Sequence, residues 1–246
     1  MAGMMVGTKG APELAAKVWR DGGGGVVRYR WHEPPRRDEG ARFPLVVFLH
    51  GAGEPGDDNR AQLKHGVADI VKWSKENKQP CFLMAPQCPA KEGWAAVDRK
   101  TMDLAAGAKP GATLARVWRL VGELTREHPV DQARVYLTGL SMGGYGTWSL
   151  LAAAPEGIAA AAPICGGGDP ATAGRFARVP VWAFHGAQDK VVPVAASRRM
   201  IEALKKAGGS PRFTEYPGIA HNSWTRTYRD GELLGWMFGQ RRAPSP

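Results

Sequence analysis

The sequence predicts an α/β fold with a mostly parallel central sheet, helices on both faces of that sheet and an antiparallel hairpin at the start. Short, continuous apolar runs recur along the 246 residues, and segments with helical spacing separate them. Such runs are typical of strands buried on both faces, and their alternation with helices indicates a parallel sheet. Two β-rich runs within 15–33 flank the glycine-rich segment 21–25, which predicts the hairpin.

The individual elements follow from these patterns in chain order. After the hairpin, strands are expected at 45–49, 81–85, 135–138, 158–163, 181–184 and 212–216. Helices are expected at 113–127, 142–154, 194–207 and around 232–238. No linker or internal repeat interrupts the series, so we interpret residues 1–246 as one domain with a core of about 15–238. The run before the strand at 181–184 is short, which predicts that no large lid domain is inserted there.

The composition excludes several classes of protein. A hydrophobic fraction of 43% and nine tryptophans exclude a disordered chain, and no apolar run approaches the roughly 20 residues of a membrane span. The net charge of +10 raises the question of nucleic acid, but the basic residues are scattered over different segments without a recognition motif. We therefore expect neither a nucleic-acid partner nor a membrane, and the oligomeric state is left open.

Two features bear on the cellular compartment. The N-terminal segment 1–10 lacks the basic start and the long apolar core of a signal peptide, so the chain is cytoplasmic as written or an exported protein whose signal has been trimmed. The three cysteines, Cys81, Cys88 and Cys165, are an odd number without CxxC spacing, which excludes a zinc site and a disulfide scaffold. Buried free thiols are the simplest interpretation, and a bridge between Cys88 and Cys165 is the alternative.

The segment after the strand at 135–138 contains the motif G-x-S-x-G, formed by Gly139, Ser141 and Gly143 and followed by a helix. In a strand–turn–helix context this motif is a nucleophile elbow, in which a sharp turn holds the serine in a strained conformation above the sheet. Larger side chains two residues before and after the serine would collide with the turn. Ser141 is therefore the predicted nucleophile, and the fold is predicted to be that of an α/β-hydrolase.

The general base and the acid should follow the nucleophile, because the chain order in this fold is serine, acid, histidine. Of the two histidines after Ser141, His185 ends a buried strand and is expected to be structural. His221 lies in a loop after the last strand and is the predicted base. Asp189, which follows the penultimate strand, is the preferred acid, and Asp169, which follows the strand before it, is the alternative.

Two backbone N–H groups are needed to stabilise the oxyanion of the reaction. One is expected from Met142, the residue after the nucleophile, and the other from the loop 50–53 after an early strand. Ala52 is the predicted donor in that loop. Gly51, which has no side chain, allows the backbone to approach the substrate closely.

Several segments of this chain resemble the polyhydroxybutyrate-depolymerase-like and feruloyl-esterase-like carboxylesterases. The resemblance runs from about residue 15 to about residue 238, and the long serine motif Thr-Gly-Leu-Ser-Met-Gly-Gly-Tyr-Gly-Thr-Trp is its most specific part. It implies a carboxylic-ester hydrolase whose triad falls on Ser141, Asp189 and His221. Members of this group are often exported. The segments that carry the resemblance are 48–54, 56–59, 85–89, 138–148, 163–169 and 221–224.

The longest irregular stretch, 87–111, follows a strand end and is expected to border the site, beginning with Gln87. Two aromatic side chains are candidates for walls of the substrate site: Trp94, within this stretch, and Trp224, three residues after His221. For both, ordinary core packing is the alternative. The acidic run at 57–59 lacks the spacing of a calcium loop, so neither a metal nor another cofactor is expected.

Together these features predict a serine hydrolase of small-molecule or polymeric carboxylic esters that works through an acyl-enzyme. Without a lid the cleft should be open, and we expect short-chain or aromatic acyl and alkyl esters as substrates. A serine peptidase with the same triad is the alternative function, since this catalytic chemistry also cleaves amides. A binding protein with a relic triad is not supported, because each catalytic position carries a competent residue.

Overall fold

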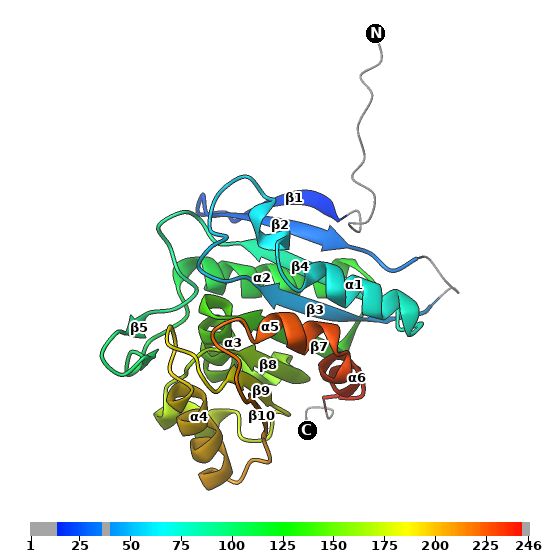
Figure 1. The fold of residues 1–246 in the computed structure, drawn as a ribbon. Coiled ribbons are helices and arrows are strands. Elements are labelled where there is room, and N and C mark those ends of the chain that lie inside the picture. The colour runs from blue at the N-terminus through cyan, green and yellow to red at the C-terminus, as the bar shows by residue number, and fades with distance from the viewer. Residues whose placement is uncertain (1–13, 36–39, 243–246) are drawn as a thin grey trace.

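The computed structural model describes residues 14–35 and 40–242 (Figure 1). Within them, the centre is an eight-stranded sheet with the order β1-β2-β4-β3-β7-β8-β9-β10. Its strands are β1 (Ala15–Arg20), β2 (Val26–His32), β3 (Phe43–Leu49), β4 (Phe82–Gln87), β7 (Val130–Leu140), β8 (Ala160–Ile164), β9 (Trp182–Gly186) and β10 (Arg212–Tyr216). The N-terminal segment 1–10, predicted to contain no signal peptide, lies outside the described residues.

The sheet is mostly parallel, as predicted. From β4 to β10, each pair of neighbouring strands is parallel. The hairpin of β1 and β2 adds two strands at one edge, where β2 pairs antiparallel with both β1 and β4. Because these strands are parallel, their carboxyl ends all lie along the same side of the sheet, perpendicular to the edge strand, and ligands of such folds bind there.

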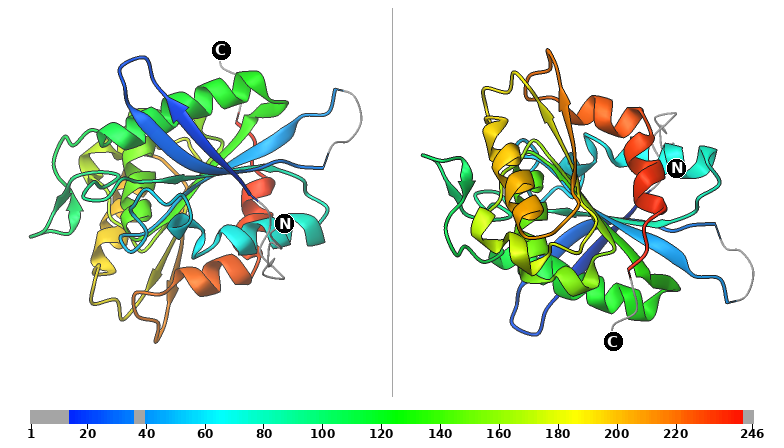
Figure 2. Two further views of the ribbon diagram at one scale, coloured as in Figure 1. Left: turned by 90° about the horizontal axis from the view of Figure 1, so that it is seen from above. Right: turned by 90° about the horizontal axis from the view of Figure 1, so that it is seen from below.

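Six α-helices cover the two faces of this sheet within the described residues (Figure 2). They are α1 (Val67–Glu76), α2 (Ala112–Glu127), α3 (Met142–Ala153), α4 (Ala195–Lys206), α5 (Trp224–Arg229) and α6 (Glu232–Phe238). Buried side chains of α2, α3 and α4 belong to one hydrophobic core, and those of α1, α5 and α6 belong to a second core. The structure is thus the three-layer α/β-hydrolase arrangement that the sequence predicts.

Strand β3 shows why the central strands are continuous apolar runs. Leu45, Val47 and Leu49 pack into the core with α2 to α4, whereas the intervening Val46 and Phe48 pack into the other core. Because successive side chains of a strand point to opposite faces, a strand covered by helices on both sides needs apolar residues at every position.

Several elements of the structure were not predicted. Helix α1 follows the loop after β3, a small hairpin of β5 (Val97–Asp98) and β6 (Asp103–Leu104) lies within the stretch expected to be irregular, and α5 begins in the loop after β10. The connection between β8 and β9 contains only the short 3₁₀ helix η3 (Pro170–Arg175). No lid domain is inserted there, in agreement with the prediction.

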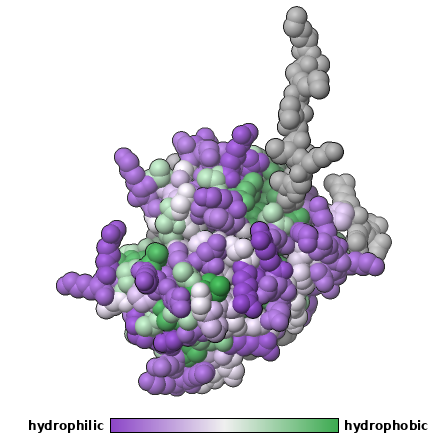
Figure 3. All heavy atoms as spheres, in the orientation of Figure 1, coloured by the Kyte–Doolittle hydropathy of each residue, from purple (hydrophilic) through white to green (hydrophobic). Residues whose placement is uncertain are grey.

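The visible surface is largely hydrophilic, and its hydrophobic areas are small and separated from one another (Figure 3). Among the described residues, Val18 and Val191 are the large hydrophobic side chains that are well exposed. None of the described helices combines the length and the apolarity that crossing a bilayer requires.

Candidate active site

The sharp turn between β7 and α3 holds Ser141 in a strained backbone conformation, with φ 52° and ψ −114°. A positive φ is rare for a residue with a side chain, and because it costs about 1–3 kcal/mol it persists only where the surroundings enforce it. The surroundings here are close: a Cβ on Gly139 would lie 2.5 Å from the carbonyl oxygen of Gly143, and a Cβ on Gly143 would overlap the carbonyl of Leu49. The two glycines therefore allow the turn to sit against the end of β3, as the motif predicts.

Ser141 lies at one end of a chain of hydrogen bonds. Its Oγ is 2.9 Å from Nε2 of His221, and Nδ1 of His221 is 2.7 Å from Oδ2 of Asp189. The three side chains come from the turn after β7, the loop after β9 and the loop after β10, so the parallel sheet brings them together at the carboxyl ends of its strands. In this arrangement Nδ1–H donates to the carboxylate and Nε2 accepts the proton of the serine hydroxyl.

The carboxyl group of Asp189 is fully buried but well supplied with donors. Its Oδ1 accepts from the backbone N–H groups of Val191 at 2.8 Å and Val192 at 2.9 Å. Burial by itself would raise the pKa of Asp189, but the hydrogen bonds from His185, His221 and these two N–H groups outweigh burial and hold the pKa well below its usual range. The group is thus an anion throughout the neutral pH range.

The alternative acid, Asp169, has a different task. It caps the N-terminus of η3, where its side chain accepts from the N–H of Ala171 at 3.0 Å, and it also accepts from the N–H of Gly107 at 3.2 Å. These bonds connect two loops at the surface. The structure therefore places Asp189 in hydrogen-bond contact with His221, whereas Asp169 is hydrogen-bonded to the backbone of other loops.

His185, expected to be structural, is fully buried and hydrogen-bonded at both ring nitrogens. It also has a contact that the sequence did not indicate: its Nε2 lies 3.2 Å from Oδ2 of Asp189, the oxygen that faces His221. Asp189 therefore lies between two histidines.

His50 organises the loop that follows β3. Its Nδ1 donates to the carbonyl of Gly51 at 2.7 Å, and its Nε2 accepts from the backbone N–H of Cys88 at 2.9 Å. Burial lowers the pKa of His50 to about 4, so the ring is neutral and keeps both bonds at neutral pH. Sequence reasoning assigned no role to this side chain, although its position directly after a buried strand was a signal.

The two predicted oxyanion donors lie on adjacent segments. Met142 is the first residue of α3, so its N–H has no partner one turn earlier within the helix. Ala52 is exposed in the loop after β3. A Cβ on Gly51 would lie 2.8 Å from Cδ1 of Leu140, which shows how closely that loop approaches the residue before Ser141.

Two side chains predicted to border the substrate are not accessible to it. Trp94 has 0% exposure, and its Nε1 donates to the carbonyl of His50 at 3.0 Å. Gln87 is 2% exposed, and its amide donates to the carbonyl of Glu54 at 3.1 Å and accepts from the N–H of Asn59 at 2.7 Å. The structure corrects the expectation for Gln87, and for Trp94 it supports the alternative of core packing. Both residues support the loop after β3 from within the protein, because its backbone groups need partners once they are buried.

Trp224, by contrast, is only partly buried and lies beside the base. Its ring packs edge-on against His221, with the centroids 5.3 Å apart and the planes at 84°. Its other neighbour is His65, at a centroid distance of 5.5 Å. The indole also packs against the second hydrophobic core, so it combines the two roles between which the sequence left a choice.

The model of the dienelactone hydrolase family matches residues 85–232, a span that contains Ser141, Asp189 and His221. The chain belongs to the dienelactone hydrolase family. This membership, with the fold, confirms the resemblance to α/β-hydrolase esterases and supports a carboxylesterase-type serine hydrolase.

Known proteins agree with this assignment. The present chain is 39% identical to a thermostable esterase of known structure. The two superpose with a TM-score of 0.86 over 93% of the present chain and 63% of the esterase chain. The present chain is 30% identical to poly(3-hydroxyalkanoate) depolymerase C of Paucimonas lemoignei over 52% of its own length. A feruloyl esterase module from Clostridium thermocellum, 14% identical with a TM-score of 0.68 over 97% of this chain and 92% of that one, shares the fold. The chain spans only 28% of the length of this depolymerase, and only 24% of the length of another curated relative.

All three cysteines of the present chain are free and buried, as predicted by the interpretation without a disulfide bridge. Cys165 lies next to the predicted triad: its sulfur, a carboxylate oxygen of Asp189 and a ring nitrogen of His221 are within 4.8 Å of one another. Burial raises the pKa of the Cys165 thiol to about 12. The other two groups of this cluster are already hydrogen-bonded to each other, Nδ1 of His221 to Oδ2 of Asp189.

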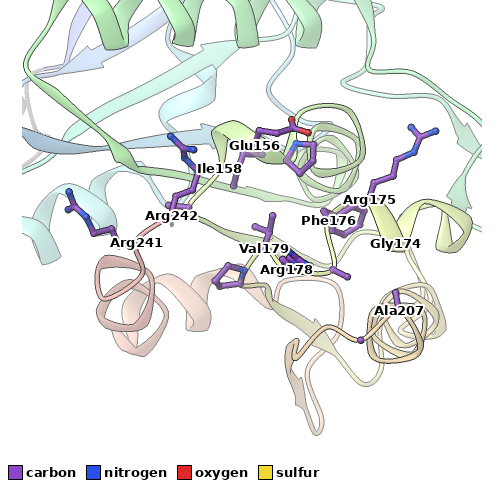
Figure 4. A pocket seen from close by; sticks show the side chains of 15 residues that line it. Glu156, Ile158, Gly174, Arg175, Phe176, Arg178, Val179, Ala207, Arg241 and Arg242 are labelled. Carbon is purple, nitrogen blue, oxygen red and sulfur yellow. The ribbon is translucent and has the colours of Figure 1, made fainter. Parts of the chain in front are cut away.

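A surface hollow of about 790 Å³ lies elsewhere (Figure 4). It is lined by residues that precede β8 and β9, such as Ile158 and Val179, and by arginines that include Arg175 and Arg178. The triad residues follow the carboxyl ends of their strands, whereas this hollow lies at the opposite edge of the sheet. It is therefore separate from the candidate active site.

Proposed function

We propose that this chain hydrolyses carboxylic esters, with Ser141 as the nucleophile, His221 as the general base and Asp189 as the acid that orients it. The observation that carries the proposal is the unbroken hydrogen-bond chain from the serine Oγ through the imidazole to the carboxylate, at 2.9 and 2.7 Å. A serine hydroxyl is a weak nucleophile, and a base within hydrogen-bond distance is what activates it.

The first half of the reaction forms the acyl-enzyme. His221 Nε2 takes the hydroxyl proton as Oγ attacks the ester carbonyl carbon, and the imidazolium is stabilised by the buried anion of Asp189. The N–H groups of Met142 and Ala52 stabilise the negative charge that develops on the carbonyl oxygen. His221 then returns the proton to the departing alcohol, which leaves the acyl group on Ser141.

The second half releases the acid. A water molecule takes the place of the alcohol, His221 accepts its proton, and the hydroxide attacks the acyl carbon. Collapse of the second tetrahedral intermediate breaks the bond to Oγ, and the proton returns to Ser141. The triad is thereby regenerated without any net consumption of acid or base.

The substrates proposed are short-chain or aromatic esters, free or carried by a polymer. The short connection between β8 and β9 leaves the carboxyl ends of the strands without an inserted lid domain. The partly buried ring of Trp224 beside His221 offers an apolar surface to an acyl or alkyl group. The similarity to proteins described as an esterase and as a poly(3-hydroxyalkanoate) depolymerase supports an ester as the cleaved bond.

A matched ester and amide with the same acyl and chromogenic groups test the proposal. The wild-type chain should cleave the ester, and Ser141→Ala should reduce its turnover by on the order of 10⁶-fold. Ser210→Ala, which changes an exposed serine, is the matched control and should retain full activity. Efficient cleavage of the amide instead of the ester would establish the peptidase alternative, and an active Ser141→Ala variant would contradict the assigned nucleophile.

A further inference from the structure

Asp189 has a second imidazole neighbour that the proposed reaction does not use. His185, in β9, places its Nε2 3.2 Å from the same oxygen, Oδ2, that faces His221. Both side chains of the His185–Asp189 pair have 0% exposure. A polar pair buried so completely must satisfy its hydrogen bonds within the protein, so the positions of its protons follow from its neighbours.

The neighbours of Nε2 are acceptors only. Besides Asp189 Oδ2, the carbonyl oxygen of Val192 lies 2.9 Å away. A carboxylate and a carbonyl cannot donate, so Nε2 of His185 must carry a proton. This proton lies between Oδ2 of Asp189 and the carbonyl oxygen of Val192. Val192 belongs to the loop whose N–H groups donate to Oδ1 of Asp189.

The other ring nitrogen faces a hydroxyl that has its own acceptor. Nδ1 of His185 is 2.8 Å from Oγ of Ser197, in α4, and that Oγ is 3.0 Å from the carbonyl oxygen of Gly166. The hydroxyl has one proton and the carbonyl has none. If the proton is donated to Gly166, Nδ1 must carry a proton too; if it is donated to Nδ1, the short Ser197–Gly166 contact has no proton at all.

The arrangement in which every short contact is a hydrogen bond is therefore the doubly protonated ring. Such an imidazolium would be costly to bury alone, but here it lies beside a carboxylate that is ionised. The other titratable groups that interact with Asp189 besides His221 are Tyr145 and Cys165, and burial raises the pKa of both, so they are neutral. His185 is thus positioned to balance the charge of Asp189.

We propose that His185 is a positioning residue of the triad. Ser197 and Gly166 hold it as an imidazolium, which orients the carboxylate of Asp189 from the side away from His221 and offsets part of its negative charge. The inference rests on the proposed function of Ser141, His221 and Asp189. A carboxylate favours the protonated form of an adjacent imidazole, and a cation on its far side weakens that effect. The consequence is that His221 is a neutral, active base at a lower pH than a triad without His185 would allow.

The kinetic test is the pH dependence of kcat/KM in His185→Gln, whose amide retains a donor but cannot carry charge. The acidic limb of the profile should move to higher pH by about one unit, since one adjacent charge is removed. Ser197→Ala, which removes the acceptor of Nδ1–H, should move it in the same direction. His32→Gln, on β2 and remote from the triad, is the matched control. A lower rate with an unmoved limb would mean that His185 only fills space, and the proposal would fail.

A direct test uses the wild-type protein and does not depend on the folding of a variant. Nitrogen NMR of the histidine rings, with the His185 signals assigned by their loss in His185→Gln, shows whether each ring nitrogen carries a proton at neutral pH. Two protonated nitrogens are expected, and one bare nitrogen on His185 would overturn the proposal. These outcomes are distinct from failure of the proposed function, which would appear as unaltered activity in Ser141→Ala.

Discussion

At the scale of single residues, the chemistry is concentrated in side chains whose protons are placed by their neighbours. Asp189 is the clearest example, because four donors surround its buried carboxylate and keep it ionised. In the proposed mechanism, the charge and the orientation of Asp189 determine whether His221 holds the tautomer that can accept the serine proton.

Replacing Asp189 by Asn tests this role. The amide can present an N–H to Nδ1 of His221, which favours the wrong tautomer, and turnover should fall by roughly 10⁴-fold with the fold retained. Asp169→Asn changes the same group in the cap of η3, and its turnover should stay within a few-fold of wild type. Both variants are measured by steady-state kinetics on one ester. The opposite ranking would transfer the role of acid to Asp169.

Trp224 is expected to influence substrate choice more than the chemical step. Removing its ring in Trp224→Ala should raise KM, or change the preference among acyl groups, by roughly 10- to 100-fold, because about 1–3 kcal/mol of apolar contact is lost. A panel of esters of different acyl length gives the selectivity, and the melting temperature gives the stability. A destabilised variant with wild-type selectivity would show that the indole serves only the core.

At the scale of elements, the site depends on how closely β3 and α3 approach each other. The Cβ that Gly143→Ala adds would meet the carbonyl of Leu49, which is rigid backbone, so strand and helix would have to separate. We expect a loss of about 1–3 kcal/mol in the free energy of unfolding and a larger relative loss of activity. Gly174→Ala, where a Cβ meets nothing within 4 Å, is the matched control and should be neutral in both. Equal effects at the two positions would contradict the packing argument.

The sequence predicted the elements that carry strong periodic signals and missed those that do not. The apolar strands, the helix after Ser141 and the hairpin agree with the structure to within about two residues, except that β7 begins five residues before the predicted 135–138. Helix α1 was missed although Val67, Ile70, Val71 and Ser74 have helical spacing, because a polar loop precedes it. The 3₁₀ helices and the small β5–β6 hairpin are too short to have a period.

The site was predictable where a motif fixes the local geometry and unpredictable where distant segments meet. The elbow at Ser141 is local. The contact of His50 with Cys88 and that of His185 with Ser197 join different strands and helices, so they depend on sheet register and packing. The burial of Trp94 has the same cause: the sequence left a choice between a wall of the site and core packing, and the contact with the loop after β3 that decides it joins distant segments.

At the scale of the whole molecule, stability should depend on pH through buried groups. The pKa of His50 in the folded protein is about 4, below the usual value of about 6.5, so the unfolded chain binds the proton more readily. Stability attributable to this group is complete above about pH 6.5 and falls by about 3 kcal/mol as the pH drops to about 4. Asp189, with its lowered pKa, adds a further loss below about pH 4, where the unfolded carboxylate becomes protonated first.

Urea unfolding at several pH values measures this dependence. We propose that the chain is one domain, so tryptophan fluorescence and circular dichroism should report one coincident transition. In His50→Gln the slope of stability between pH 6.5 and pH 4 should be smaller than in wild type. An unchanged slope would assign the acid sensitivity to other groups, and two separate transitions would contradict a single domain.

The central claim, that Ser141 is the activated nucleophile of an esterase, is tested most directly by covalent labelling. A fluorophosphonate reacts only with a serine that an adjacent base has activated, and peptide mass spectrometry locates the adduct. We predict one adduct, on Ser141, with loss of esterase activity in proportion to labelling and with much slower labelling in His221→Ala. An adduct on another serine, or full esterase activity in protein fully labelled at Ser141, would contradict the account.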